Sequence, residues 1–435
     1  MGSGKTYSTL KELKPETQTI VVSERLELAV RAAEIAPHLY VPKAKPTKRN
    51  HVFELLKSGK SCSITQELLR RLDSDTVSLI RELGVHCVWD ELLESTIEIK
   101  GTNSNSCSNP DEYISPGVRQ ILSAIDVLNI DQETGLVRWD ALKFMPPAGS
   151  GMIEDIYNWA NNGVLHWFPT NDSDLSGFVV TAFPVRILEA FKSVSILCYG
   201  FEGLPLEGYM KLFNIPYEFN DRFLDDEKYN LNILSERINV VSDCNVYKYL
   251  DQEALRANHS NGFSMSKGCW DNLITDSVAK GIGSRLELYM RQNQFKQEDA
   301  LWTVYKDHRN RVGKGFNRKV LNIAGEDNIN EFRAGTVKTY ASWNIKGTNE
   351  FKDRRLMMHL CCPHINEDLR QFFLSRGIRL NNDAYILEMT RQWIMRGVAR
   401  NRDSEEVMTC LIASKKARTL FCDWLNNRSS MKKAA

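Results

Sequence analysis

The first six residues, Met1-Gly2-Ser3-Gly4-Lys5-Thr6, constrain the fold of this chain more than any other stretch. They match the last six positions of the phosphate-binding loop G-x-x-x-x-G-K-[ST], whose backbone N–H groups surround phosphate oxygens. In this loop the lysine reaches the β- and γ-phosphates, and the threonine hydroxyl helps to hold Mg²⁺. The sequence therefore predicts an α/β domain that binds ATP and Mg²⁺. Its expected phosphate contacts are Gly2, Ser3, Gly4, Lys5 and Thr6.

The sequence contains only the last part of the phosphate loop. Its opening glycine, and the strand that normally leads into it, would precede Met1. We therefore expect the first strand of this domain to be missing or truncated. Residues 4–14 are expected to form the helix that follows the loop, with the positive end of the helix dipole directed at the same phosphates.

The rest of the chain alternates short apolar runs with helical patterns, which is typical of parallel sheets covered by helices. Strands are expected at residues 18–23, 61–65, 85–89, 177–182, 193–199, 237–241, 356–360 and 407–412. A chain of 435 residues is too long for one core. We predict a first domain over residues 1–214 with a helical insertion at about 92–176, a linker at 215–230, a second domain over 231–425 and a polar tail at 426–435.

Charge and cysteine content narrow the class of protein. The net charge is +1, from 56 Lys+Arg against 55 Asp+Glu, so only a local basic patch could bind nucleic acid. Residues 43–49 and 306–319 are such patches, and either could equally be a solvated face. The ten cysteines form no C-x-x-C pair, which favours a reducing compartment over a disulfide framework. No apolar stretch is long enough to cross a bilayer, so we expect no membrane partner and a cytoplasmic location.

Asp90-Glu91 is the second candidate site, because it follows a buried strand that comes after the phosphate loop. At the end of such a strand, an aspartate can hold Mg²⁺ through water, and a glutamate beside it can orient the water that attacks the γ-phosphate. A solvated turn is the alternative interpretation of this dipeptide. Thr6 and Asp90 are the expected metal-binding residues.

Two further candidate sites lie in the second half. Gly347-Thr348-Asn349, followed by Asp353, is a small, hydrogen-bonding segment that can press its backbone against a phosphate, although a plain polar turn is the alternative. Residues 391–402 contain Gln392, Arg396 and Arg400, whose spacing suits the stabilisation of charge on a transferring phosphoryl group. Complementing the dipole at a helix C-terminus is the alternative, and it explains Arg400 and Arg402 better than Gln392 and Arg396.

The order of these motifs resembles superfamily 2 helicases, and more narrowly a group of DEAD/DEAH-box-type, helicase-like proteins encoded by bacteriophages. The resemblance extends over nearly the whole chain. In the first half it includes Ala182-Phe183-Pro184 and the stretch from Ile196 to Gly203. In the second half it includes residues 264–267, 300–306, 346–354, 392–402 and 413–418, with Trp424.

The resemblance implies a role for each matching residue. Gly4, Lys5 and Thr6 match motif I, Asp90 and Glu91 match motif II, and Ser23 with Thr65-Gln66 match segments that contact nucleic acid. Motif III couples hydrolysis to movement and matches Cys198-Tyr199-Gly200, with Thr181-Ala182 as the alternative. Gly347, Thr348, Asn349 and Asp353 match motif V. Gln392, Arg396 and Arg400 match motif VI, in which Arg396 is the first choice for an arginine finger. Met395 stands where motif VI usually has a glycine, and Arg400 comes one residue late.

The resemblance implies two tandem RecA-like P-loop NTPase domains with parallel sheets. The expected function is an ATP-dependent DNA helicase or translocase of phage replication or recombination, in the cytoplasm of the host cell. Its expected partners are single-stranded or forked DNA and phage replication proteins. The alternative is a catalytically inactive, helicase-like factor that binds nucleic acid or assists assembly. A packaging or restriction motor is a weaker alternative, because no acidic nuclease cluster is evident.

Overall fold

The computed structural model divides the chain into two compact units. The N-terminal unit comprises Lys5–Glu218 and Asn366–Asn381, and the C-terminal unit comprises Phe219–Ile365 and Asn382–Ala435. The structure describes residues 5–90, 97–100, 122, 124–132, 135–147, 149–169, 177–198, 200–220, 233–317, 320–324, 336–345, 350–401 and 404–430. Part of the expected linker at 215–230 and the end of the polar tail lie outside these ranges.

A five-stranded parallel sheet of order β10-β4-β1-β3-β2 forms the centre of the N-terminal unit. Predicted apolar runs form the strands β1, β3, β4 and β10, whereas the short strand β2 was not predicted. The strands are β1 (Thr19–Ser23), β2 (Leu39–Tyr40), β3 (Ser61–Thr65), β4 (His86–Asp90) and β10 (Ser193–Leu197). The helices are α1 (Lys5–Lys11), α2 (Leu26–Ile35), α3 (Lys48–Lys57), α4 (Gln66–Arg70), α5 (Ser74–Leu83), α8 (Val185–Leu188) and α9 (Pro205–Leu212).

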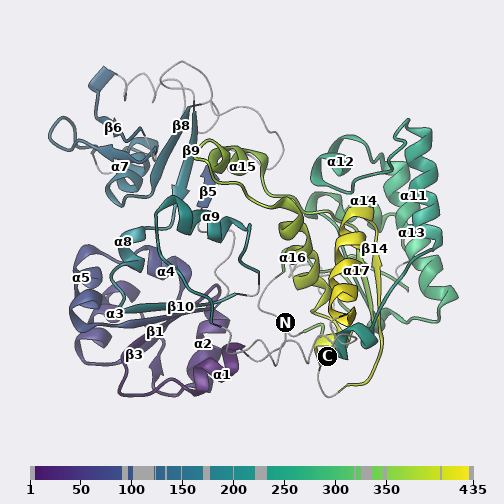
Figure 1. Ribbon diagram of the computed structural model, residues 1–435, viewed down its shortest axis with the longest axis horizontal. Helices are drawn as coiled ribbons and strands as arrows, with labels where there is room; N and C mark the ends of the chain where they lie inside the picture. Colours follow the sequence, from purple (N-terminus) through teal and green to yellow (C-terminus); the bar gives the residue numbers. More distant parts are fainter. Residues whose placement is uncertain are drawn as a thin grey trace. The chain divides into compact units, whose positions relative to one another are not determined.

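Helices cover both faces of this sheet because, after β2, successive strands are added toward the opposite edge of the sheet. The crossover from β1 to β2 runs one way along the sheet and those from β2 to β3 and β3 to β4 run the other, so right-handed connections place α2 opposite α3 and α5. Helices α1 and α2 lie side by side (Figure 1), and Leu10 and Ala32 pack there with Val21 and Val88 of the sheet. The fixed position of α1 matters because its first residue is Lys5.

Among its described residues, the insertion between β4 and β10 contains antiparallel strands beside a helix, and the prediction of a helical insertion at about 92–176 did not include these strands. The strands are β5 (Ile97–Lys100), β6 (Leu128–Ile130), β7 (Val137–Trp139), β8 (Leu165–Pro169) and β9 (Gly177–Ala182), with the helix α7 (Met152–Asn161) beside them. They form a sheet of order β5-β9-β8 and a β6-β7 hairpin. Strand β5 alternates apolar and charged residues, which is the period of a strand rather than a helix.

Helix α15 (Glu367–Leu374) belongs to the N-terminal unit, although it follows the strands of the second sheet in the sequence. The ring of Phe372 meets the ring of His166 edge-on, with centroids 6.3 Å apart. The backbone N–H of Asn381 donates to the carbonyl of Gly203 at 2.7 Å. These contacts join the segment 366–381 to the insertion and to α9.

A four-stranded parallel sheet of order β11-β14-β13-β12 forms the centre of the C-terminal unit. Its strands are β11 (Ile238–Val240), β12 (Ala300–Thr303), β13 (Leu356–His359) and β14 (Met408–Ile412). Its helices are α11 (Asn245–Arg256), α12 (Lys267–Asn272), α13 (Asp276–Gln292), α14 (Arg309–Gly313), α16 (Asn382–Ile394) and α17 (Lys415–Ser430). Short 3₁₀ turns are η4 (Gln297–Asp299), η5 (Lys306–His308) and η7 (Val398–Arg400).

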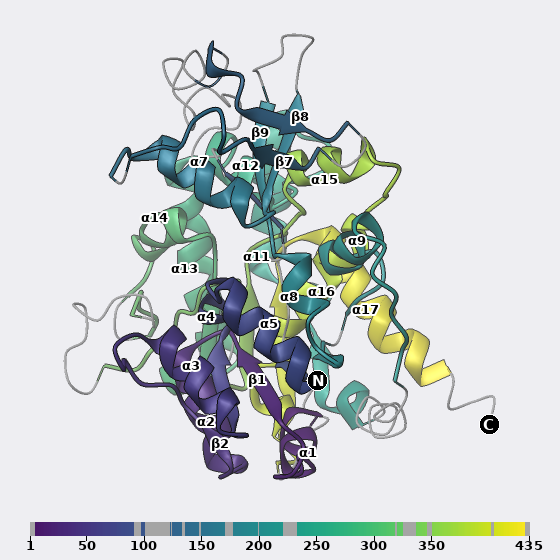
Figure 2. The ribbon, with the colours of Figure 1, turned by 90° about the vertical axis from the view of Figure 1, so that its left-hand side faces the viewer.

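The helices of the C-terminal unit also occupy two faces. The crossover from β11 to β12 runs in the opposite direction to that from β13 to β14, which places α11 and α13 opposite α16. Helices α16 and α17 lie side by side in both views (Figure 2). In the part of the chain that the structure describes, no helix combines the length and the apolar character needed to cross a membrane.

His359 at the end of β13 gives the C-terminal unit a predicted sensitivity to acid. Burial lowers the pKa of this histidine from 6.5 to about 3. Between pH 6.5 and about pH 3, His359 of the unfolded chain binds a proton that His359 of the folded chain does not. The free energy of unfolding therefore decreases as the pH falls below 6.5. Acidification to about pH 5 should lower the free energy of unfolding by roughly 2 kcal/mol. Amide exchange of β13 in the full chain measures this loss. His359→Leu should remove it, and an unchanged pH dependence would contradict this account.

Candidate functional site

Four strands of the N-terminal sheet end at one edge, and a predicted site residue lies at the end of each. Ser23 ends β1 and is paired in register with Thr65, which ends β3. Asp90 ends β4 and is paired with Leu197, after which Cys198 follows. The carboxyl edge of a parallel sheet is where ligands bind in open α/β folds. The topology therefore gathers residues that are far apart in the sequence along one edge.

The first two residues of α1 contact this edge directly. The Thr6 hydroxyl donates to Oδ1 of Asp90 at 2.7 Å, and Nζ of Lys5 donates to the carbonyl of Cys198 at 3.1 Å. The residues predicted for motif I thus form hydrogen bonds with residues predicted for motifs II and III. Burial raises the pKa of the Cys198 thiol, and the Lys5 ammonium partly offsets this rise. The thiol is therefore neutral, and its residue meets Lys5 through the backbone.

Several predicted site residues cannot be placed. Those outside the described residues are Gly2, Ser3, Gly4, Glu91, Tyr199, Gly347, Thr348 and Asn349.

The predicted nucleic-acid contacts of the N-terminal unit are mostly internal in this conformation. Ser23 is 2% exposed and Gln66 is 7% exposed. The Thr65 hydroxyl accepts a hydrogen bond from the N–H of Leu68 at 3.3 Å and so caps the N-terminus of α4. Gly200 is half-buried beyond the end of β10. The cap gives Thr65 a structural role that the sequence interpretation did not include.

At the predicted motif VI, a buried carboxylate holds two residues in place. Glu388 on α16 is 3% exposed and forms an ion pair with Arg391 one helical turn away. The same carboxylate accepts a hydrogen bond from Nε2 of Gln392 at 2.7 Å. Glu388 was not predicted as a site residue. Its spacing of four residues from Gln392 on a helix is the signal that could have identified it.

Arg396 connects the predicted motifs VI and V. It is 3% exposed, and Nη2 of its guanidinium donates to the carbonyl of Ile345 at 3.4 Å. On the other side, the backbone N–H of Val398 donates to the carbonyl of Arg354 at 2.9 Å. These bonds join the two segments before and after the triplet at 347–349. Asp353, the acidic residue of motif V, is exposed.

Arg237 is a second residue that the sequence interpretation missed. It lies just before β11, is 9% exposed, and donates to the carbonyls of Val398, Asn401 and Glu406 at 3.0, 2.9 and 3.3 Å. One guanidinium therefore fixes the turn η7 that carries the half-exposed Arg400. Only the three-dimensional structure reveals this role, because a single arginine before a strand has no sequence signature.

Arg237→Ala should destabilise the C-terminal unit by about 3 kcal/mol, because it leaves the backbone carbonyls of Val398, Asn401 and Glu406 without their charged donor. Arg237→Lys keeps the charge but loses the planar fork of donors, so an intermediate loss is expected. Urea unfolding of the full chain measures both values. If the alanine variant were as stable as the wild type, Arg237 would not fix this turn.

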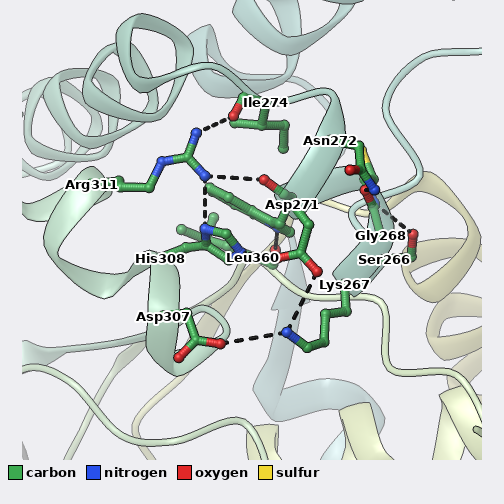
Figure 3. A network of polar contacts seen from close by, with 12 residues as sticks. Ser266, Lys267, Gly268, Asp271, Asn272, Ile274, Asp307, His308, Arg311 and Leu360 are labelled. Carbon is green, nitrogen blue, oxygen red and sulfur yellow. Dashed lines mark hydrogen bonds and ion pairs between the residues drawn. The ribbon is translucent and has the colours of Figure 1, made fainter. Parts of the chain in front are cut away.

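Several cations in or beside the basic stretch at residues 306–319 form ion pairs and hydrogen bonds within the protein. Figure 3 shows Lys267 between Asp271 and Asp307, at 3.5 and 3.4 Å from the two carboxylates. His308 is joined to Asp271 at 2.8 Å and to Arg311 at 2.7 Å. Because an arginine can only donate, Nδ1 of His308 accepts and Nε2–H donates to the aspartate. The network braces α12 and α14, so these cations carry a structural function.

Three comparisons place this architecture among known proteins. Residues 233–425 match a family model described as the YonV C-terminal Rossmann-like domain. The SPbeta prophage-derived protein YonV of Bacillus subtilis (strain 168) is 23% identical over 449 residues, covering 98% of this chain and 97% of that protein. A solved structure titled XPD_APO superposes with a TM-score of 0.50 at 13% identity, covering 98% of this chain and 93% of that one.

The chain therefore has an XPD-like, two-domain α/β fold with two parallel sheets, as the sequence predicted for the fold class. At 13% identity, this likeness shows the fold alone.

Proposed function

We propose that this chain is an ATP-dependent helicase or translocase that acts on DNA during phage replication or recombination. One observation carries the proposal. In a helicase-like fold, Thr6 is hydrogen-bonded to Asp90 at 2.7 Å, and Lys5 contacts the backbone at the end of β10 at 3.1 Å. A hydroxyl, a carboxylate and an ammonium thus meet at the carboxyl edge of a parallel sheet. Phosphoryl transfer from a nucleotide requires these groups at this position.

The residues at this edge fit ATP with Mg²⁺. Hydroxyl and carboxylate oxygens are ligands that Mg²⁺ prefers, and Thr6 and Asp90 supply one of each. When bound, the ion neutralises charge on the phosphates. With ATP bound, Lys5 would hold a phosphate oxygen in place of the Cys198 carbonyl, and Glu91 would orient the attacking water. The segment at Cys198 would then lose its hydrogen bond from Lys5, which would couple phosphate binding to this segment.

The C-terminal unit contributes the other groups in this proposal. Arg396 acts as the arginine finger, and Gln392 and Arg400 support it. The bonds between Arg396 and Ile345 and between Val398 and Arg354 support a coupling between motifs VI and V. The triplet at 347–349 contacts the DNA backbone, so a change at the phosphate is transmitted to the DNA. Single-stranded or forked DNA is the partner, together with other phage replication proteins.

ATP turnover by the full chain, with and without single-stranded DNA, tests this function. We expect turnover to rise several-fold with DNA and to fall by about 100-fold in Asp90→Asn, which removes the carboxylate charge. Single-stranded DNA that binds without any ATP turnover would overturn the proposal. That result would favour the inactive, nucleic-acid-binding factor instead.

A further inference from the structure

A pocket of about 500 Å³ opens at the carboxyl ends of β13 and β14 in the C-terminal unit. Its walls come from the loop at 261–264, from the segment after β13 and from the first turns of α17. The residues predicted for motifs I to VI do not include them, although Ser264 and residues 414–416 lie in segments that carry the resemblance to phage helicase-like proteins. The carboxyl end of a parallel sheet is the usual position of a ligand site in open α/β folds, and this volume suits a small organic ligand.

One end of the pocket is cationic. Helix α17 begins there at Lys415, and the Ser414 hydroxyl caps it by accepting from the N–H of Ala417 at 3.3 Å. The remaining N–H groups of a first helical turn have no partner within the helix and attract anions. Lys415 is exposed and forms no hydrogen bond or ion pair with any residue in the described ranges. It therefore adds an uncompensated positive charge to the helix terminus.

The other charged groups at the pocket are already paired. Lys416 forms an ion pair with Asp383 at 2.5 Å, so these two side chains contribute little net charge. Nδ1 of His364 lies 2.9 Å from the amide nitrogen of Asn382 and accepts from it. This arrangement leaves Nε2–H of the histidine as a further donor. Among the residues that the structure describes, the pocket thus presents one free cation and neutral donors, which is a suitable environment for one phosphate.

The body of the pocket is apolar. Phe263, Leu420 and Cys362 line it, and the phenylalanine is 8% exposed. An aromatic ring and aliphatic side chains accept the flat face of a nucleobase, which is how many proteins hold single-stranded nucleic acid. Inorganic phosphate alone would leave this apolar wall unoccupied. An apolar wall with a cationic end is complementary to a base joined to a phosphate.

We propose that this pocket binds one nucleotide unit, with its phosphate at Lys415 and the start of α17 and its base against Phe263 and Leu420. The unit comes either from a single strand of DNA or from a free nucleotide. Only the first source rests on the proposed function, in which case the pocket is a DNA contact of the C-terminal unit outside motifs V and VI. The site is independent of Lys5, so it exists whether or not ATP is hydrolysed.

Photochemical cross-linking of the full chain tests the proposal with two probes. One is a thymidine oligonucleotide with a single 5-iodouracil, and the other is free 5-iodo-dUMP. Mass spectrometry of the irradiated protein should locate the adduct on residues 261–264 or 414–420. Adducts with the oligonucleotide alone identify a DNA strand as the source, and adducts with both probes identify a site open to free nucleotides. Adducts confined to other segments, or no adduct, would overturn the proposal.

Matched variants make this test specific. Lys415→Glu should lower the yield at these segments by about tenfold, the equivalent of roughly 1.4 kcal/mol. An acidic residue is favourable at a helix N-terminus, so the fold should persist. Thr419→Trp, which blocks the pocket without changing charge, should also lower the yield. Lys280→Glu changes the same charge at an exposed position on α13 and should not. Equal losses in Lys415→Glu and Lys280→Glu would overturn the proposal.

Lys5→Ala separates this site from the proposed function. The variant should lose ATP turnover and keep the adduct on residues 261–264 or 414–420. Loss of that adduct in Lys5→Ala would show that labelling of these segments depends on Lys5, and would overturn the proposal of a second, independent site.

Discussion

Lys5→Ala should lower DNA-stimulated ATP turnover by about 100- to 1,000-fold, the loss expected when a charged donor to the reacting phosphates is removed. The Lys5 ammonium donates to the carbonyl of Cys198 at 3.1 Å in the structure, and the variant loses this hydrogen bond as well. The fold should survive because α1 is held by Leu10, which is 1% exposed. Steady-state turnover and circular dichroism of the variant measure the two effects.

Lys11→Ala is the matched control for Lys5→Ala. Lys11 lies in the last turn of the same helix, and its ammonium is 4.6 Å from the centre of the Tyr7 ring. The control makes the same change of charge away from the sheet edge, so its turnover should equal that of the wild type. Wild-type turnover in Lys5→Ala would mean that this lysine does not contact the phosphates. Equal losses in both variants would indicate a general effect of charge.

Arg396→Ala should lower turnover by about 1,000-fold, which is the lower range for an arginine finger. The residue is buried and donates to the carbonyl of Ile345, so alanine should also destabilise the C-terminal unit by about 1–3 kcal/mol. Arg396→Lys separates the two effects, because lysine can keep one hydrogen bond but lacks the fork that holds two phosphate oxygens. Turnover and urea unfolding are measured on both variants.

The comparison of the two Arg396 variants decides the role of this residue. A lysine variant with nearly wild-type stability and a turnover close to that of alanine indicates contact with the transferring phosphate. A lysine variant that recovers both stability and turnover indicates that Arg396 only braces the segment at Ile345.

Much of the fold could be predicted because parallel strands bury both faces and appear as apolar runs. The runs at residues 18–23 and 61–65 became β1 and β3, and the strand ending at Asp90 became β4. Their parallel arrangement then places each following residue at one edge. This geometry explains why Thr6 and Asp90 could be expected to meet from the sequence.

The insertion and two elements of the C-terminal unit could not be predicted in this way. Strands β5 and β8 are short and antiparallel, and their alternation extends over too few residues to stand out. Strand β12 has only four residues, although all four are buried. Helix α11 lies in a stretch of mixed polar residues, and its buried side appears only when it packs beside α13. Long-range packing, which has no local signal, decided each of these elements.

The residues that position the candidate motifs could not be predicted from the sequence, because their contacts also depend on the tertiary fold. Arg237 holds the η7 turn through backbone carbonyls, and carbonyls exist at every position of a sequence. Glu388 holds Gln392 within one helix, so its helical spacing gave a signal that a motif pattern did not contain. Sequence motifs indicate the groups that face a ligand, whereas the residues that orient them depend on the tertiary fold.

The dependence of ATP turnover on the length of single-stranded DNA tests the central claim most directly. A translocase hydrolyses ATP repeatedly as it moves along one strand, and a longer strand allows more steps before the protein dissociates. Turnover at saturating DNA should therefore rise with strand length and then level off. Asp90→Asn should give no such rise, because it removes the carboxylate that accepts from Thr6. Turnover that is absent at every strand length, in a protein that still binds the DNA, would contradict the account.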